Sequence, residues 1–383
     1  MAGYIFSLDS VKALENYAMN GLYATKLSKP KNRWQQHHEG TFADYVTMKE
    51  GDNVYFFIKR KIYGIGKMIN VNQDCKYFNY PEAGIPVPFH YEEMKDRLLW
   101  DEGEYSIDQR FICLFAPDPY FFKNGVDMDD VLSSNPRAFK MLRAFWKLSF
   151  IKFDDEENQA FRDVLIKHNQ PVLKNPASQN IFATDYNRNH SIIKDKTIGL
   201  DYNIKLDKIL STCANDNGLA HEMALEVAIL SQLANNDPHT VSILGKWDYL
   251  SHQVIASPFK PIDYMDKIDI FGYSYIEGHK PTKSKYLIIE LKKDTAHSEN
   301  LDQIMKYVDW VTNEYCFGDY SMIKSFIIAY DFDDQIKTNK PTLGNRKYTT
   351  GMKPAKSMSW NDLTLVSYKY IADLNKIELE VID

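Results

Sequence analysis

The pattern of hydrophobic and polar positions changes character along the chain. From residue 3 to about residue 118 it is rich in strand-like runs, separated by breaks that contain Gly, Pro and Asn: YIFSL, NVYFFIKRKIYGIGKMI and RFICLF. Between residues 127 and 170, apolar positions recur at helical spacing in FKMLRAFWKLSFI and NQAFRDVLIKHN. The first region therefore predicts a small twisted sheet or barrel, and the second predicts helices.

The last part of the chain predicts an α/β core. A polar, Asn-rich stretch at residues 171–204 is expected to be a linker or surface loop. After it, helical and strand patterns alternate in the order helix, hairpin, helix, strand: LAHEMALEVAILSQLAN, KIDIFGYSYI with YLIIELKK, ENLDQIMKYVDWVTNEY and IKSFIIAYDF. Two later β-like runs, LTLVSYKYIA and IELEVI, can extend the sheet. We therefore expect an α/β (α+β) protein of three parts, with boundaries at 1–126, 127–204 and 205–383.

Composition narrows the class of protein more than its function. With 44% hydrophobic, 14% aromatic and 26% charged residues, the chain is a folded globular protein and not a disordered one. Four cysteines without a CxxC pair indicate neither a zinc knuckle nor a disulfide framework. The start MAGYIFSLDSVKALENYA lacks signal-peptide features, and no apolar run reaches membrane-spanning length, so we expect a cytoplasmic protein. A net charge of -6 does not indicate a nucleic-acid binder, but it averages over local basic faces.

Two carboxylates and one amine are expected to meet at the predicted hairpin. Side chains alternate along a strand, so Glu290 and Lys292 share one face of YLIIELKK. Asp269 lies in the preceding strand, and a hairpin through EGHKPTKSK brings it beside Glu290. Such a pair suits Mg²⁺, which activates water and neutralises charge on a phosphodiester. Lys292 can orient the attacking water or stabilise the developing negative charge.

The surroundings of this pattern decide how it is interpreted. An E-x-K on a strand is by itself more often a solvated face or an ion pair, but the run before Glu290 is apolar on both faces, as in a buried strand, which favours a site. The segment WDYLSHQVIASPFKP, between helix and hairpin, adds Lys246, Trp247, His252 and Lys260. Lys246 and Lys260 are candidates for phosphate contacts, and packing is the favoured interpretation for the set.

An ordered set of positions resembles the PD-(D/E)xK nuclease superfamily, with the RecB-like and NucS (EndoMS) nuclease domains as the nearest likeness. The set consists of Asp269, Glu290, Lys292, Gln303 and Tyr307. It covers about residues 218–330. The resemblance implies that Asp269 and Glu290 bind Mg²⁺, for which Mn²⁺ can substitute, that Lys292 assists the water, and that Gln303 and Tyr307 shape the site. The sequence departs from the family's name in having no Pro before Asp269, a position that is loose across the superfamily.

The same resemblance implies an acidic residue on the helix before the hairpin. Glu222 and Glu226 lie four residues apart on one face of LAHEMALEVAIL, and Glu226 is the favoured candidate.

The amino-terminal region resembles PUA-like barrels of the EVE, YTH or ASCH type over about residues 3–130. The likeness is carried by a Gly-Asp turn at Gly51 and Asp52, a β run, a basic turn and a returning GIG strand. In those folds an aromatic pocket can hold a flipped, often modified, base. The candidate walls are Trp34, Tyr45, Phe57 and Tyr63, with Asp44 as a polar reader. Core packing is the alternative for each aromatic residue.

Basic residues of this region are candidates for phosphate contacts. Lys59, Arg60 and Lys61 form the basic turn, and a solvated surface is the alternative.

Together these features predict a restriction-type, Mg²⁺-dependent DNA endonuclease that acts on double-stranded DNA. Dependence on modified bases follows from the barrel resemblance alone. One such core cuts one strand, so we expect a homodimer, at least on DNA. Two alternatives stay open: a NucS-like repair or mismatch nuclease, and a catalytically silent nucleic-acid-binding module. Activity on unmodified, modified and mismatched duplexes would separate the first two, and metal dependence would exclude the third.

Overall fold

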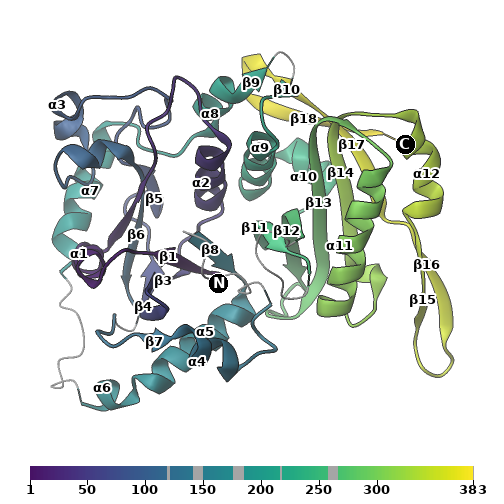
Figure 1. The fold of residues 1–383 in the computed structure, drawn as a ribbon, viewed down its shortest axis with the longest axis horizontal. Helices are drawn as coiled ribbons and strands as arrows, with labels where there is room; N and C mark the ends of the chain where they lie inside the picture. The colour runs from purple at the N-terminus through teal and green to yellow at the C-terminus, as the bar shows by residue number, and fades with distance from the viewer. Residues whose placement is uncertain (119–120, 141–149, 176–184, 216–217, 258–265, 383) are drawn as a thin grey trace. The chain divides into compact units, whose positions relative to one another are not determined.

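A computed structural model describes most of the chain, namely residues 1–118, 121–140, 150–175, 185–215, 218–257 and 266–382. The chain forms two compact units, one made of Met1–Arg33 and Met48–Lys205 and the other of Trp34–Thr47 and Leu206–Asp383 (Figure 1). None of the described helices combines the length and the apolar character needed to cross a bilayer.

The first unit is built on a mixed eight-stranded sheet of order β2-β6-β4-β3-β1-β8, with β5 beside β6 and β7 beside β4. Its strands are β1 Gly3–Ser7, β2 Leu22–Lys26, β3 Asn53–Ile58, β4 Lys61–Met68, β5 Lys76–Phe78, β6 Gln109–Pro117, β7 Val126–Asp127 and β8 Phe150–Phe153. Strands β1 and β3 run parallel, and the other pairs are antiparallel. The strand-like runs of the sequence are β1, the β3–β4 hairpin and β6, so the prediction of a sheet here is confirmed.

Helices surround this sheet, including two where a linker was expected. They are α1 Val11–Asn20, α3 Tyr91–Met94, α4 Met128–Ser134, α5 Asp155–His168, α6 Gln170–Lys174 and α7 Asn187–Gly199. The interpretation of 171–204 as a linker or loop is wrong where α6 and α7 form. The Asn-rich composition hides two buried anchors of α7, Ile193 and His190, and the ring of His190 lies 2.8 Å from the carbonyl oxygen of Gly21.

The predicted helix FKMLRAFWKLSFI is only partly described. Residues 141–149 lie outside the described part of the chain, and the end of the run forms strand β8, which pairs antiparallel with β1. The helical prediction is therefore wrong at this end. Strand pairing with β1 buries Ile151 and Phe153, whose spacing of two residues is typical of a strand.

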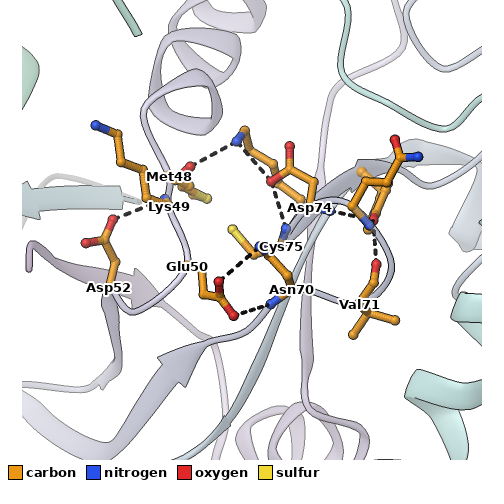
Figure 2. A network of polar contacts seen from close by, with 11 residues as sticks. Met48, Lys49, Glu50, Asp52, Asn70, Val71, Asp74 and Cys75 are labelled. Carbon is orange, nitrogen blue, oxygen red and sulfur yellow. Dashed lines mark hydrogen bonds and ion pairs between the residues drawn. The ribbon is translucent and has the colours of Figure 1, made fainter. Parts of the chain in front are cut away.

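A network of polar contacts holds the Gly-Asp turn before β3 (Figure 2). Gly51 adopts a left-handed φ of 91°, which favours glycine. The buried carboxylate of Asp52 accepts a hydrogen bond from the backbone N–H of Ala2 at 2.9 Å. Glu50 accepts from the side-chain amide of Asn70 at 3.1 Å, as Figure 2 shows. The turn thus joins the amino terminus to the sheet and has a structural role.

The second unit contains a six-stranded sheet of order β11-β12-β13-β14-β17-β18. Its strands are β11 Tyr249–Ile255, β12 Lys267–Tyr275, β13 Lys283–Ala296, β14 Ile323–Phe332, β17 Leu363–Ile371 and β18 Lys376–Ile382. The central strands β13, β14 and β17 are parallel, and β11, β12 and β18 add antiparallel edges. Two small hairpins lie outside the sheet, β9 Ala214–Asn215 with β10 Gly218–Leu219 and β15 Arg346–Thr350 with β16 Lys356–Trp360.

The helices of this unit confirm the predicted helix, hairpin, helix, strand order. They are α2 Gln36–Val46, α8 Leu206–Cys213, α9 Glu222–Ala234, α10 Pro238–Leu244, α11 Glu299–Tyr315 and α12 Asp334–Leu343. Both α9 and α11 pack against β13. The middle of this strand is apolar because helices cover it. Glu290 is its one buried acid, which is unusual in such a strand.

Helix α2 is the largest departure from the expected organisation. Its segment, Trp34–Thr47, comes from the region predicted to be a barrel, yet it belongs to the second unit and packs on α9. The buried residues His38, Phe42 and Tyr45 recur at helical spacing, so the segment has a pattern typical of a helix. The chain passes from the first unit to the second after Lys205.

Candidate active site

The candidate site begins with a carboxylate that is tied to the neighbouring strand. Ile270 of β12 pairs with Ile289 of β13, so the preceding Asp269 lies across from the following Glu290. The Oδ2 atom of Asp269 accepts a hydrogen bond of 2.8 Å from the backbone N–H of Leu291. The structure therefore brings together the two acids that the sequence places 21 positions apart.

Glu290 is the most deeply buried acid of the site. It is 1% exposed, and its Oε1 atom accepts a hydrogen bond of 2.7 Å from the ammonium of Lys292 on the same face of β13. Within the described residues, its Oε2 atom is buried and has no hydrogen-bond partner. The Lys292 ammonium also lies 3.8 Å from Glu222 of α9. One carboxylate oxygen of Glu290 is thus held by a cation, while the other is left for a ligand.

Gln253 links Asp269 to the acid on α9. Its side-chain amide donates to Glu226 Oε2 at 2.9 Å and to Asp269 Oδ1 at 3.2 Å. Gln253 lies inside β11 but has a left-handed φ of 50°, which is uncommon for a residue with a side chain. Backbone strain of this kind is concentrated at functional sites. Here it accompanies an amide that contacts two carboxylates, and Glu226 is the acid of α9 that reaches them.

His252 completes a chain of polar contacts that runs into the site. Its Nδ1 atom lies 2.7 Å from Glu226 and its Nε2 atom lies 2.8 Å from Asp44 of α2. Burial disfavours the charged ring, but the hydrogen bonds to Asp44 and Glu226 outweigh it and raise the pKa of His252 to about 10. His252 is therefore an imidazolium that donates to both carboxylates and fixes the side chain of Glu226.

Gln303 and Tyr307 also form a pair, one turn apart on α11. The amide of Gln303 donates to the hydroxyl of Tyr307 at 3.1 Å. Burial raises the pKa of Tyr307, the Gln303 contact opposes this, and the negative charges of Glu290 and Asp269 raise it further. The phenol stays protonated at neutral pH, and its proton is available to an acceptor.

The electrostatics of the site favour a bound cation. Burial, followed by the charges of Glu290 and Glu226, raises the pKa of Asp269 well above its usual range. Burial likewise raises the pKa of Glu290 to about 6, although Lys292 opposes the shift. Among the described residues, no three His, Cys, Asp or Glu side chains are grouped to hold a metal ion. Mg²⁺ is commonly bound by one or two carboxylates and several waters, and the unpartnered Oε2 of Glu290 beside Asp269 fits that donor set.

The raised pKa of Asp269 predicts that this carboxylate destabilises the metal-free protein. A carboxyl whose pKa is raised by folding loses stability as pH rises through its folded pKa, so the ionised form is unfavourable at higher pH. We expect Asp269→Asn to increase the free energy of unfolding in EDTA by about 1 kcal/mol. If Mg²⁺ binds at Asp269, it should raise the Tm of the wild type, and we expect Asp269→Asn to abolish this increase. Thermal unfolding with and without Mg²⁺ measures both effects, and a variant that keeps the Mg²⁺ shift would exclude Asp269 as a ligand.

The residues expected to form a base-reading pocket are divided between the two units. Trp34, Asp44 and Tyr45 belong to the second unit, whereas Phe57 and Tyr63 belong to the first. The expectation that all of them line one barrel pocket is therefore wrong, because the segment of α2 leaves the barrel region. Trp34 and Tyr45 are 1% and 0% exposed, so they are core residues of the second unit.

The expected phosphate-binding residues have mixed positions. Lys59, Arg60 and Lys61 lie on the exposed β3–β4 turn, where Arg60 pairs with Asp129 at 2.6 Å. Lys246 is exposed, whereas Lys260 lies outside the described residues. The positions of these side chains do not test whether they bind phosphate. The sequence analysis missed two features of the site. One is the role of Gln253, and the other is the contact between His252 and Asp44. No short-range pattern could indicate a contact between residues 208 positions apart.

Comparisons with known proteins give partial similarities only. No protein-family model matches the chain, and no curated protein matches it. A repair endonuclease from Pyrococcus abyssi is 21% identical, with 29% of this chain and 40% of that chain covered and a TM-score of 0.19. EndoMS, in a structure of its complex with double-stranded DNA, is 20% identical. The match covers 22% of this chain and 30% of that chain, with a TM-score of 0.17. A Rhodopseudomonas palustris protein with an NMR structure is 14% identical. The match covers 45% of this chain and 95% of that chain, with a TM-score of 0.26.

The chain thus spans less than half the length of either endonuclease. Because the TM-scores are low, we base the function on the geometry of the site.

Proposed function

We propose that the protein is a metal-dependent nuclease of the PD-(D/E)xK type that hydrolyses DNA phosphodiesters. One observation carries the proposal: the buried Glu290 has an unpartnered oxygen next to Asp269, while its other oxygen is held 2.7 Å from the Lys292 ammonium. Two neighbouring strands that bring two acids and an amine together in a largely buried place are costly unless a ligand or a reaction uses these groups.

Asp269 and Glu290 would hold the ion, with Mg²⁺ preferred and Mn²⁺ able to substitute. When bound there, the ion lowers the pKa of a water molecule and neutralises charge on the phosphodiester. The two contacts that position Asp269, from Leu291 and Gln253, leave lone pairs on both of its oxygens. The carboxylate is therefore oriented before any ligand arrives, which lowers the entropy lost on binding.

The remaining residues act on the water and the phosphate. Lys292 is a point charge with three donors, of which Glu290 occupies one, so it can also donate to the attacking water or to a phosphate oxygen. Tyr307 can donate its phenol proton to the phosphate, since Gln303 donates to the same hydroxyl oxygen. Water attacks phosphorus, the P–O3′ bond breaks, and a proton goes to the leaving oxygen, giving a 5′-phosphate and a 3′-hydroxyl.

A metal and substrate panel tests this function. The purified protein is incubated with unmodified, modified-cytosine and mismatched duplexes in Mg²⁺, Mn²⁺, Ca²⁺ or EDTA, and the product ends are mapped. We expect cleavage in Mg²⁺ and Mn²⁺ and none in EDTA. Preference for modified DNA would identify a restriction-type enzyme, and preference for mismatches a repair-type one. Binding without cleavage of any duplex in any metal would contradict the proposal and indicate a silent binding module.

The same assay addresses assembly. If two chains are required to cut both strands, double-strand breaks will increase with the square of protein concentration, while nicks will increase linearly. Equal dependence of nicks and breaks would contradict a dimer on DNA.

A further inference from the structure

The β15–β16 hairpin is a basic projection of the second unit. Residues 335–361 contain six cationic side chains and no acidic one, although the whole chain has a net charge of -6. They are Lys337, Lys340, Arg346, Lys347, Lys353 and Lys356. Only Arg346 has an ion pair within the described residues. Residues 335–361 therefore concentrate positive charge, and among the described residues only Arg346 of this set is paired with an acid, although Asp334 begins helix α12.

One face of this ribbon is made of hydrogen-bond donors and is solvent-exposed. Lys347 pairs with Ser359 and Thr349 pairs with Ser357, and paired residues of an antiparallel ladder project to the same side. All four side chains are exposed. A two-stranded ribbon fits the major groove of B-form DNA, where Lys, Ser and Thr can contact base edges and phosphates.

The base of the hairpin is fixed, which makes the ribbon a rigid projection. Arg346 donates to both oxygens of Asp309 on α11, each at 2.8 Å. The indole of Trp360 donates to the backbone carbonyl of Ile323, the first residue of β14, at 3.0 Å. The Tyr320 ring lies 5.5 Å from that of Tyr348 of the hairpin. Less conformational entropy is lost when a rigid ribbon binds than when a flexible loop does.

An exposed aromatic residue accompanies this base. Phe317, in the segment that leads from α11 to Tyr320, is 97% exposed. Its φ is 54°, a left-handed conformation that is strained for a non-glycine residue. A strained, exposed phenyl ring stabilises nothing in the described fold. Proteins that bend DNA insert apolar side chains of this kind between base steps.

The hairpin is attached to the same strand of the sheet that pairs with the strand of Glu290. Ile323, which anchors Trp360, pairs with Tyr286 on β13, and Ile327 pairs with Glu290. The step of four residues from Ile323 to Ile327 corresponds to about 13 Å along β14. This length is less than one helical turn of DNA.

We propose that the β15–β16 hairpin enters the major groove of a DNA duplex and that Phe317 contacts the same duplex beside it. The inference rests on the proposed nuclease function and adds the surface that selects double-stranded, B-form substrate. An A-form RNA duplex has a major groove too narrow for the ribbon, and single strands have none.

Binding in EDTA tests this surface without any cleavage. A labelled DNA duplex of about three helical turns is titrated with wild type, with Lys347→Gln/Lys353→Gln/Lys356→Gln, and with the control Lys208→Gln/Lys369→Gln/Lys376→Gln. The control removes the same charge from other surfaces of the second unit. We expect the hairpin variant to bind at least about tenfold more weakly near physiological salt, with a salt slope smaller by about 3. The control should stay near wild type.

Phe317→Asn separates binding from folding. Asn tolerates the left-handed conformation, so Tm should rise or stay unchanged, while duplex affinity falls at least about fivefold, as on loss of one stacked ring. Hairpin and Phe317 variants that bind as the controls do would overturn the inference even if the protein cleaves DNA. An equal loss on RNA duplex or single strands would overturn groove binding. Weakened duplex binding without any cleavage would leave this surface supported and refute the nuclease function alone.

Discussion

Replacing Lys292 with Met is expected to lower kcat for duplex cleavage about a thousandfold while changing duplex affinity in EDTA little. The ammonium lies 2.7 Å from Glu290 and is the one cation on the acidic face of β13 in the described structure. In the proposed function it would stabilise charge that grows in the transition state, so its loss should affect the rate more than ground-state binding. Single-turnover cleavage with saturating enzyme measures this rate without interference from product release.

Lys293→Met is the matched control. Lys293 follows directly in β13 and pairs with Asp294 at 2.9 Å, whereas Lys292 pairs with Glu290. Equal losses in the two variants would indicate a general electrostatic effect, and an unimpaired Lys292→Met would remove the lysine from the mechanism. Retained Tm in both variants shows that the fold is intact.

The part of the site that depends on strand periodicity could be predicted from the sequence. Alternation places Glu290 and Lys292 on one face, and a hairpin places Asp269 opposite, whatever the rest of the fold does. Helical periodicity places Gln303 and Tyr307 together for the same reason. These contacts are local, so a short stretch of sequence determines them.

The supporting contacts could not be predicted, because they join distant segments. Asp44 reaches His252 only because residues 34–47 leave the amino-terminal region and pack on α9. The aromatic content of that region also suggested pocket walls where the structure has core residues such as Trp34. Burial of an aromatic side chain cannot be distinguished from ligand stacking without knowing which segment covers it.

The route of the chain has a consequence for how the site is assembled. Because Asp44 comes from the amino-terminal third and the other polar contacts come from the last half, the second unit lacks part of its polar chain until both segments are present. A fragment that starts at Leu206 would leave His252 with Glu226 alone. The second unit is therefore not expected to be obtained intact by cutting the chain at the boundary after Lys205.

His252→Asn is expected to lower the free energy of unfolding by about 3 to 5 kcal/mol near neutral pH, the usual cost of leaving buried charges unpaired. Its ring is 12% exposed and its partner Glu226 is 3% exposed, so water cannot replace the lost contacts. The variant also removes the contact that fixes Glu226, and Gln253 donates to both Glu226 and Asp269. The rate of cleavage should therefore fall, although His252 is not proposed to contact the substrate. Urea unfolding, with the exposed His279→Asn as control, measures the loss.

The pH dependence identifies the charge that causes this stability. The pKa of His252 is raised from 6.5 to about 10, so its contribution is fully present below pH 6.5 and is lost as pH rises through about 10. The difference in unfolding free energy between wild type and His252→Asn should therefore shrink by up to about 1.4 kcal/mol per pH unit across this range. A difference that stays constant with pH would mean that the ring is neutral. A neutral ring has one N–H, so Asp44 or Glu226 would then have to carry a proton and donate to the other ring nitrogen.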